Sequence, residues 1–242
     1  MDLAYPKKKN KIFLMPAKNS LKQYLENGYY HLYNRGVEKR LIFQDKQDYS
    51  VFLSYLKEYL LPKDEKTLLN RLSGIDTTWA EKDKILKALR LNNYSDEILL
   101  LGFCLMPNHF HLLIKQLMID SIDRFISSIG TRYTMYFNRK YKRVGSLYQG
   151  VYKAVLVSTD EQLLQLSRYI HRQALNLQGE TLQAQEVQPS SYGEYLGKRN
   201  SEWVKTSEIL NFFPKNHPST SYESFVKETD DLTQIGSLIL EE

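Results

Sequence analysis

The chain has 242 residues, enough to bury a core of its own, and its 33 Lys and Arg outnumber its 28 Asp and Glu. This excess of positive charge indicates a polyanionic partner, and 18 Tyr and 10 Phe offer rings on which unpaired bases stack, although most such rings pack in cores. No apolar run reaches the roughly 20 residues of a membrane span, and a single cysteine excludes a disulfide framework. We therefore expect a protein of a reducing compartment with no membrane segment.

The N-terminal third predicts a tail, a strand and a helix. Residues 1–27 contain a lysine run, and we expect a basic tail without a fold of its own. Residues 29–33 are rich in strand formers and end at a turn signal, Asn34-Arg35-Gly36. Apolar side chains then recur every three and four residues up to Leu60, after acidic residues that suit a helix start.

The middle of the chain predicts an insert followed by a hairpin. Residues 62–96 are mostly polar and carry a helical period near their end, so we expect a helical insert. Residues 98–106 are nearly all apolar, a Met-Pro-Asn turn interrupts them, and an apolar run resumes over 109–115. These two runs predict a strand pair that is buried on both faces.

A long helix and a second strand–helix pair are expected next. The helix covers about 122–137, and a strand over 151–157 follows two glycines. Ser158 and Glu161 have the spacing of a capping box at the start of another helix, which continues to Ala174. Basic side chains gather in and after the second half of the long helix: Arg132, Arg139, Lys140, Lys142 and Arg143.

The predicted order of elements defines an α+β fold. A strand, a helix, the insert, two strands, a helix, a strand and a helix fit a ferredoxin-like or RRM-like antiparallel sheet with helices on one face. We divide the chain into the tail 1–27, a catalytic domain 28–178 that contains the insert 62–96, and a C-terminal extension 179–242.

Two histidines on the second strand of the hairpin are the first candidates for chemistry. Side chains alternate along a strand, so His109 and His111 point to one face and Phe110 points to the other. A divalent metal would satisfy both imidazoles where other polar partners are scarce. The alternative is a pair of hydrogen-bonded structural histidines, because such spacing also arises by chance.

A helical pair four residues apart adds a nucleophile and a third ligand. Tyr169 and Gln173 share one face of the predicted helix. Two imidazoles and an amide oxygen leave positions open for water and phosphate, a set that suits Mn²⁺ and tolerates Mg²⁺. A tyrosine hydroxyl needs a nearby metal or base before it can attack phosphorus. Taken by itself, Tyr169 is one tyrosine in 18 and is better explained as a packing residue.

Several motifs, in order, resemble the single-tyrosine HUH (IS200-like) transposases, particularly the REP-associated tyrosine transposases. The run Leu105-Met106-Pro107-Asn108-His109-Phe110-His111 is similar to the family's histidine strand, and Tyr169-Ile170-His171-Arg172-Gln173 is similar to its tyrosine helix. Similar stretches occur at residues 30–36, 42–43, 48–49, 145–153, 190–197 and 203–204. Many REP-associated relatives have Asn where this chain has Gln173. The insertion-sequence branch of the family tends to use Gln at this position.

The resemblance implies a transposase and single-strand DNA endonuclease. It implies that His109, His111 and Gln173 hold the metal, and that Tyr169 attacks a DNA phosphate to leave a 5′-phosphotyrosine and a free 3′-hydroxyl. The DNA is expected to be a hairpin with a flanking tetranucleotide, and a bacterial cytoplasmic, nucleoid-associated location is expected. DNA-backbone binding is expected of Arg35, Arg132, Arg139, Lys140, Lys142 and Arg143.

Two other functions stay open at this point. Replication or mobilisation nickases share the histidine strand, but they commonly carry the tyrosine ahead of it or use two tyrosines, whereas Tyr169 lies after it. A domesticated DNA-binding module would keep the fold without cleavage. The chain is expected to act as a monomer or a homodimer, since relatives do both.

Overall fold

A four-stranded antiparallel sheet lies at the centre of the molecule, with the strand order β2-β3-β1-β4. The computed structural model describes residues 24–176, 185–186, 188–228, 235–236 and 238, so most of the predicted tail 1–27 lies outside the described residues. The strands of the sheet are β1 (Tyr29–Arg35), β2 (Ile98–Met106), β3 (His109–Gln116) and β4 (Lys153–Val157). β2 and β3 form the expected hairpin, and β1 pairs with both β3 and β4.

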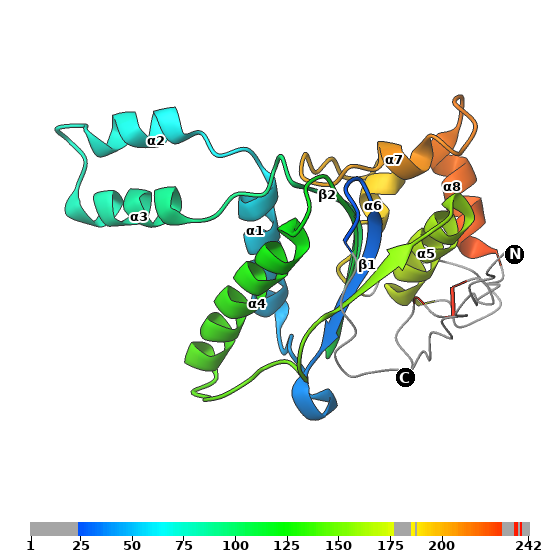
Figure 1. The fold of residues 1–242 in the computed structure, drawn as a ribbon, viewed down its shortest axis with the longest axis horizontal. Coiled ribbons are helices and arrows are strands. Elements are labelled where there is room, and N and C mark those ends of the chain that lie inside the picture. The colour runs from blue at the N-terminus through cyan, green and yellow to red at the C-terminus, as the bar shows by residue number, and fades with distance from the viewer. Residues whose placement is uncertain (1–23, 177–184, 187, 229–234, 237, 239–242) are drawn as a thin grey trace, which may run out of the picture.

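One face of the sheet is covered by α1 (Lys46–Leu60) and α4 (Ser121–Lys140), which lie side by side (Figure 1). The side chain of Asp45 caps α1 by accepting a hydrogen bond from the backbone of Asp48. A short 3₁₀ helix, η1 (Val37–Lys39), joins β1 to this layer. The core between sheet and helices contains many aromatic side chains, among them Phe43, Phe52, Phe110, Phe125 and Tyr133.

The insert forms two helices, α2 (Glu65–Leu72) and α3 (Trp79–Arg90), that extend away from the sheet (Figure 1). α3 begins with a full capping box in which Thr78 and Glu81 satisfy each other's backbone amides. Only Ile85 is buried among the side chains of these two helices, and Trp79 at the start of α3 is 88% exposed. The insert therefore adds little to the central core.

The opposite face of the sheet is covered by α5 (Asp160–Gln173) and by helices of the C-terminal extension (Figure 1). Those helices are α6 (Tyr192–Tyr195), α7 (Ser207–Leu210) and α8 (Pro218–Lys227), and two short strands, β5 (Leu175–Asn176) and β6 (Gln185–Glu186), pair between α5 and α6. The predicted capping box of α5 is wrong by one residue. Thr159 is the N-cap and bonds the backbone of Gln162, because the chain is still extended at Thr159.

The predicted fold class is confirmed, since the element order and the antiparallel sheet are those of a ferredoxin-like α+β fold. The expected placement of the helices on one face holds for α1 and α4, whereas α5 and the extension cover the other face. No helix in the described ranges is long and apolar enough to cross a membrane.

Candidate active site

The histidine pair lies on the α5 face of β3. Phe110 belongs to the core beneath α1 and α4, so strand alternation places His109 and His111 on the other side. Their ring centroids are 4.8 Å apart and the rings are perpendicular. His111 is fully buried and His109 is nearly so, which puts both imidazoles in a poorly hydrated site.

Hydrogen bonds fix which ring nitrogens are free. Nδ1 of His109 lies 2.5 Å from Oδ1 of Asn108, and Nδ1 of His111 lies 2.9 Å from Nε2 of His31. An amide oxygen only accepts, so the Asn108 bond leaves the lone pair of His109 on Nε2. Nε2 of His111 is buried and has no hydrogen-bond partner. A buried polar atom without a partner is costly, and beside a second neutral imidazole this one is suited to bind a ligand.

Burial also keeps the imidazoles neutral. It lowers the pKa of His109 to about 4, and the positive charge of Arg35 adds to the effect. Burial likewise holds the pKa of His111 well below its ordinary value, with His31, His109 and Arg35 contributing. Neutral imidazole nitrogens are the form that binds divalent metals.

The sequence analysis missed His31, the third histidine of this cluster. It lies on β1, is fully buried, and its ring stacks on His111 at 5.1 Å. Its pKa is lowered to about 4, first by burial. The only signal in the sequence was a histidine inside the strand Tyr30-His31-Leu32. Whether this histidine meets His111 depends on the register between β1 and β3.

Tyr169 lies on α5 directly above the histidine strand. Its ring meets His111 edge-on, with 5.7 Å between the centroids, and the side chain is 9% exposed. Gln173 is half-buried on the last turn of α5, one turn beyond Tyr169. Among the described residues, no hydrogen bond joins Gln173 to either histidine. The structure thus brings together His109, His111 and Tyr169, and places Gln173 on the adjoining turn.

The chemistry of these groups fits a divalent metal. Two neutral imidazoles present unprotonated nitrogens, one of which is buried and unsatisfied, and an amide oxygen is available on the facing helix. No cluster of three or more His, Cys, Asp and Glu side chains arranged for a metal is present in the described part of the chain. A third protein ligand from the described residues would therefore be another residue type, as Gln173 is.

Arg35 is the predicted DNA-binding residue that lies at the histidines. It stands opposite His109 in the register between β1 and β3, on the same face of the sheet. Its Nε atom is buried without a hydrogen-bond partner. A cation with an unused donor at this position suits an anionic ligand.

The other predicted DNA-binding residues lie on the α4 side of the sheet, and several have protein partners. Arg132 pairs with Glu58 at 2.7 Å and stacks on Tyr55, while Lys140 pairs with Asp45 and Asp48. The remaining three differ: Arg143 bonds Asn138 and the Ser146 carbonyl, whereas Arg139 and Lys142 are exposed.

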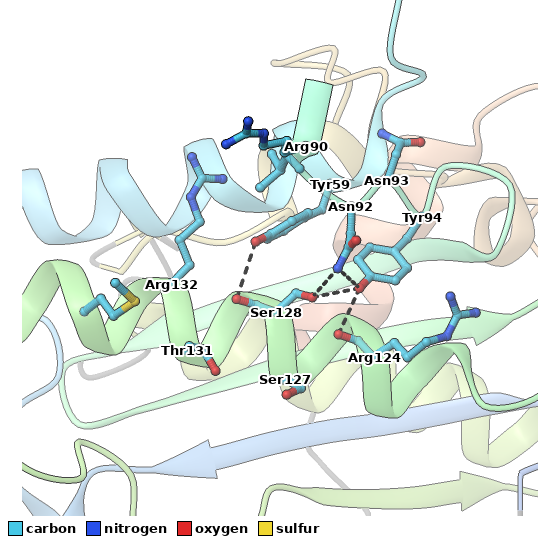
Figure 2. A pocket seen from close by; sticks show the side chains of 12 residues that line it. Tyr59, Arg90, Asn92, Asn93, Tyr94, Arg124, Ser127, Ser128, Thr131 and Arg132 are labelled. Carbon is cyan, nitrogen blue, oxygen red and sulfur yellow. Dashed lines mark hydrogen bonds between the residues drawn. The ribbon is translucent and has the colours of Figure 1, made fainter. Parts of the chain in front are cut away.

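A surface pocket beside the insert also lies apart from the histidines. Figure 2 shows it between α4 and the segment that follows α3. Its volume is about 670 Å³. Its hydroxyls bond one another, since Tyr94 Oη lies 2.7 Å from Ser128 Oγ and 3.0 Å from the Arg124 carbonyl. Neither His109 nor Tyr169 lines it, so it is not the candidate site.

The fold and site define a class of protein: a ferredoxin-like α+β protein with a metal-competent histidine pair facing a helical tyrosine. Residues 70–173 match the model of a family described as "Transposase IS200 like". The predicted resemblance to single-tyrosine, IS200-like transposases is thereby confirmed over these residues, and the match supports a transposase function. The matched segment contains β2, β3, α4, β4 and all of α5.

Solved structures give looser likenesses. The chain is similar to a REP-associated tyrosine transposase bound to a REP hairpin, with 8% identity, a TM-score of 0.40, and coverage of 78% of this chain and 98% of that one. It is also similar to a provisionally named transposase from Deinococcus radiodurans R1, with 17% identity, a TM-score of 0.26, and coverage of 64% and 97%. No curated protein matches the chain significantly. The resemblance to the IS200-like family rests on the sequence match over residues 70–173.

Proposed function

We propose that this chain is a metal-dependent single-strand DNA endonuclease and strand transferase that works through a 5′-phosphotyrosine. The observation that carries the proposal is the unsatisfied Nε2 of the buried, neutral His111 beneath the ring of Tyr169. A structural histidine pair, the alternative, would have each buried nitrogen in a hydrogen bond. The IS200-like match over residues 70–173 supports the same chemistry.

The metal would be held by Nε2 of His109, Nε2 of His111 and the amide oxygen of Gln173. When bound, a Mn²⁺ or Mg²⁺ ion would polarise the scissile phosphate as a Lewis acid. Asn108 holds His109 with its lone pair on the metal side, and burial keeps the proton off His111. Gln173 is included as a ligand because it lies one turn beyond Tyr169 on the same face of α5.

Tyr169 would be the nucleophile. Its Oη forms a bond to phosphorus while the bond between phosphorus and the 3′ oxygen breaks, and the 3′ oxygen leaves as a hydroxyl that has gained a proton. Attack by the 3′-hydroxyl of another strand reverses this step and releases Tyr169. The phosphotyrosine conserves the cleaved bond, so strand transfer needs no nucleotide cofactor.

The DNA would reach the site over Arg35. Its unused buried Nε opposite His109 supports contact with the phosphate beside the scissile one. Arg139 and Lys142 are exposed and remain candidates for the hairpin backbone, whereas the ion pairs of Arg132 and Lys140 reduce what those residues can offer. The hairpin target, the oligomeric state and the domain limits 28–178 and 179–242 stay predictions.

The decisive experiment incubates the protein with Mn²⁺ and a labelled single-stranded hairpin from its own genomic neighbourhood. We expect a denaturant-resistant protein–DNA band that is lost with EDTA, with His109→Ala and with Tyr169→Phe. Tyr55→Phe is the matched control, since it removes the same hydroxyl from α1 on the other face of the sheet. That variant should keep the band.

Two results would contradict the proposal. A band that persists in Tyr169→Phe would show that another group is the nucleophile. Tight hairpin binding without a band in any divalent metal would favour the domesticated binding module. Strand transfer should also be tested directly, by adding a second strand with a free 3′-hydroxyl to the covalent adduct.

A further inference from the structure

A chain of hydrogen bonds links the histidine pair to the far C-terminal end of the described chain. Nδ1 of His31 lies 2.5 Å from the carbonyl oxygen of Leu238, and Nε2 of His31 lies 2.9 Å from Nδ1 of His111. His31 is fully buried and Leu238 is 2% exposed. The Leu238 carbonyl is therefore the start of a buried relay that ends at Nε2 of His111.

The carbonyl oxygen of Leu238 determines which nitrogen donates and which accepts in each of these hydrogen bonds. A carbonyl oxygen carries no proton, so Nδ1 of His31 must donate the first bond. In a neutral imidazole the other nitrogen then has the lone pair, and Nε2 of His31 accepts from Nδ1–H of His111. That leaves Nε2 of His111 unprotonated, and this is the atom that is buried without a partner.

The packing holds the relay in place. Leu238 and Ile235 belong to the same core cluster as Tyr169 and Leu113, on the α5 face of the sheet. The backbone N–H of Leu238 bonds the Ile235 carbonyl at 2.7 Å, which forms a turn that presents the Leu238 carbonyl inward. The stacked rings of His31 and His111, inclined by only 19°, keep both nitrogens aligned.

We propose that His31 is a positioning residue which, with the Leu238 carbonyl, holds His111 in the tautomer whose Nε2 can bind a metal. Leu238 thus belongs to the outer shell of the metal site, although it is 207 residues away from His31 along the chain. This inference rests on the proposed function for the identity of the ligand, but the tautomer it assigns is a property of the metal-free protein.

Two substitutions of His31 separate its chemistry from its bulk. In His31→Leu neither bond of the relay survives, and we expect Mn²⁺ affinity to fall about 10- to 100-fold, as is usual when the partner of a metal-bound histidine is lost. In His31→Gln the side-chain amide can donate to Leu238 and its oxygen can accept from His111, so affinity should stay within a few-fold of the unsubstituted protein. A chain that ends after residue 234 should behave like His31→Leu.

Metal affinity is measured by the electron paramagnetic resonance of free Mn²⁺ during titration. The control is His217→Leu, which removes an exposed imidazole that takes no part in these hydrogen bonds and should leave affinity unchanged. An affinity of His31→Leu equal to that of the unsubstituted protein would overturn the positioning role. Failure of the unsubstituted protein to bind Mn²⁺, or unchanged binding in His111→Ala, would instead overturn the proposed function.

The tautomer itself is read from ¹⁵N nuclear magnetic resonance of the imidazoles in the unsubstituted, metal-free protein. We expect a protonated Nδ1 and an unprotonated Nε2 on His111. A protonated Nε2 would refute the inference whether or not any variant folds. In His31→Leu the two tautomers of His111 should become mixed, whereas in His31→Gln the original one should persist.

Discussion

Two buried polar groups, one on each face of the central sheet, differ in their hydrogen bonding. On the α1–α4 face, the buried carboxylate of Asp48 accepts hydrogen bonds from Tyr136, Tyr141 and Lys140. On the α5 face, the buried Nε2 of His111 has no partner. Satisfied groups stabilise a fold, while an unsatisfied one costs stability unless a ligand meets it. The comparison assigns a stabilising role to Asp48 and a ligand-binding role to Nε2 of His111.

The largest expected change in stability comes from a substitution that opens a cavity in the core beneath α1 and α4. Phe52 is fully buried and its ring contacts Phe43, Phe110 and Tyr133. Phe52→Ala should lower the free energy of unfolding by about 3–5 kcal/mol, measured by urea denaturation. Mn²⁺ affinity of the folded fraction should stay within twofold. A loss below about 1 kcal/mol, or a large change in metal affinity, would show that the two faces are not separable in this way.

The second prediction is that metal binding on the α5 face stabilises the protein. At 100 times its dissociation constant, Mn²⁺ should raise the free energy of unfolding by about 2.7 kcal/mol, and EDTA should abolish the gain. His109→Ala should remove most of this gain, since it deletes one of the two imidazoles. In Phe52→Ala the gain should persist. Equal stabilisation of the protein and of His109→Ala would place the ion elsewhere.

The third effect tests the buried carboxylate. Lys140→Met removes the ion pair of Asp48 but leaves its two tyrosine donors, so the free energy of unfolding should fall by about 1–3 kcal/mol at neutral pH. Lys142→Met, two residues further on and exposed, is the matched control and should change stability little. Equal losses of stability in Lys140→Met and Lys142→Met would mean that the ion pair between Lys140 and Asp48 does not stabilise the fold.

The pH dependence of the same pair has a definite sign. Burial by itself raises the pKa of Asp48, but bonds from Lys140, Gln44, Tyr141 and Tyr136 outweigh it and the pKa is lowered. A carboxyl group with a lowered pKa in the folded state stabilises the fold above its unfolded pKa, about 3.9, and the contribution is lost as the pH falls through the folded value. Lys140→Met should therefore lose less stability than the unsubstituted protein between pH 6 and pH 3.

Local patterns were sufficient to predict the sheet and one edge of the site. The apolar runs 98–106 and 109–115 around a Met-Pro-Asn turn define β2 and β3, and alternation along β3 puts His109 and His111 on one face. Tyr169 could not be distinguished from other tyrosines by spacing, and only the resemblance to a family singled it out. The helix cap was misplaced by one residue because Ser158 and Thr159 both suit the position.

Contacts between distant residues were out of reach of the sequence. His31 meets His111 only through the pairing of β1 with β3, and Leu238 meets His31 only through packing of the C-terminal extension. The same limit applies to charge. A run of basic residues predicts a DNA-binding surface, but Lys140 is held by two carboxylates while Lys142 is exposed, and no pattern within the run separates them.

The smallest expected change in stability comes from replacing the exposed members of the basic cluster. Arg139 and Lys142 are exposed, so replacing both with Gln should change the free energy of unfolding by less than about 0.5 kcal/mol. If each contacts one phosphate of a single strand, the slope of log affinity against log salt should become shallower by about 0.7 per residue. The slope is measured by titrating hairpin DNA at several salt concentrations. A slope that changes in Arg35→Gln but not in this double variant would move the DNA path from the α4 surface to the α5 face, where the histidines lie.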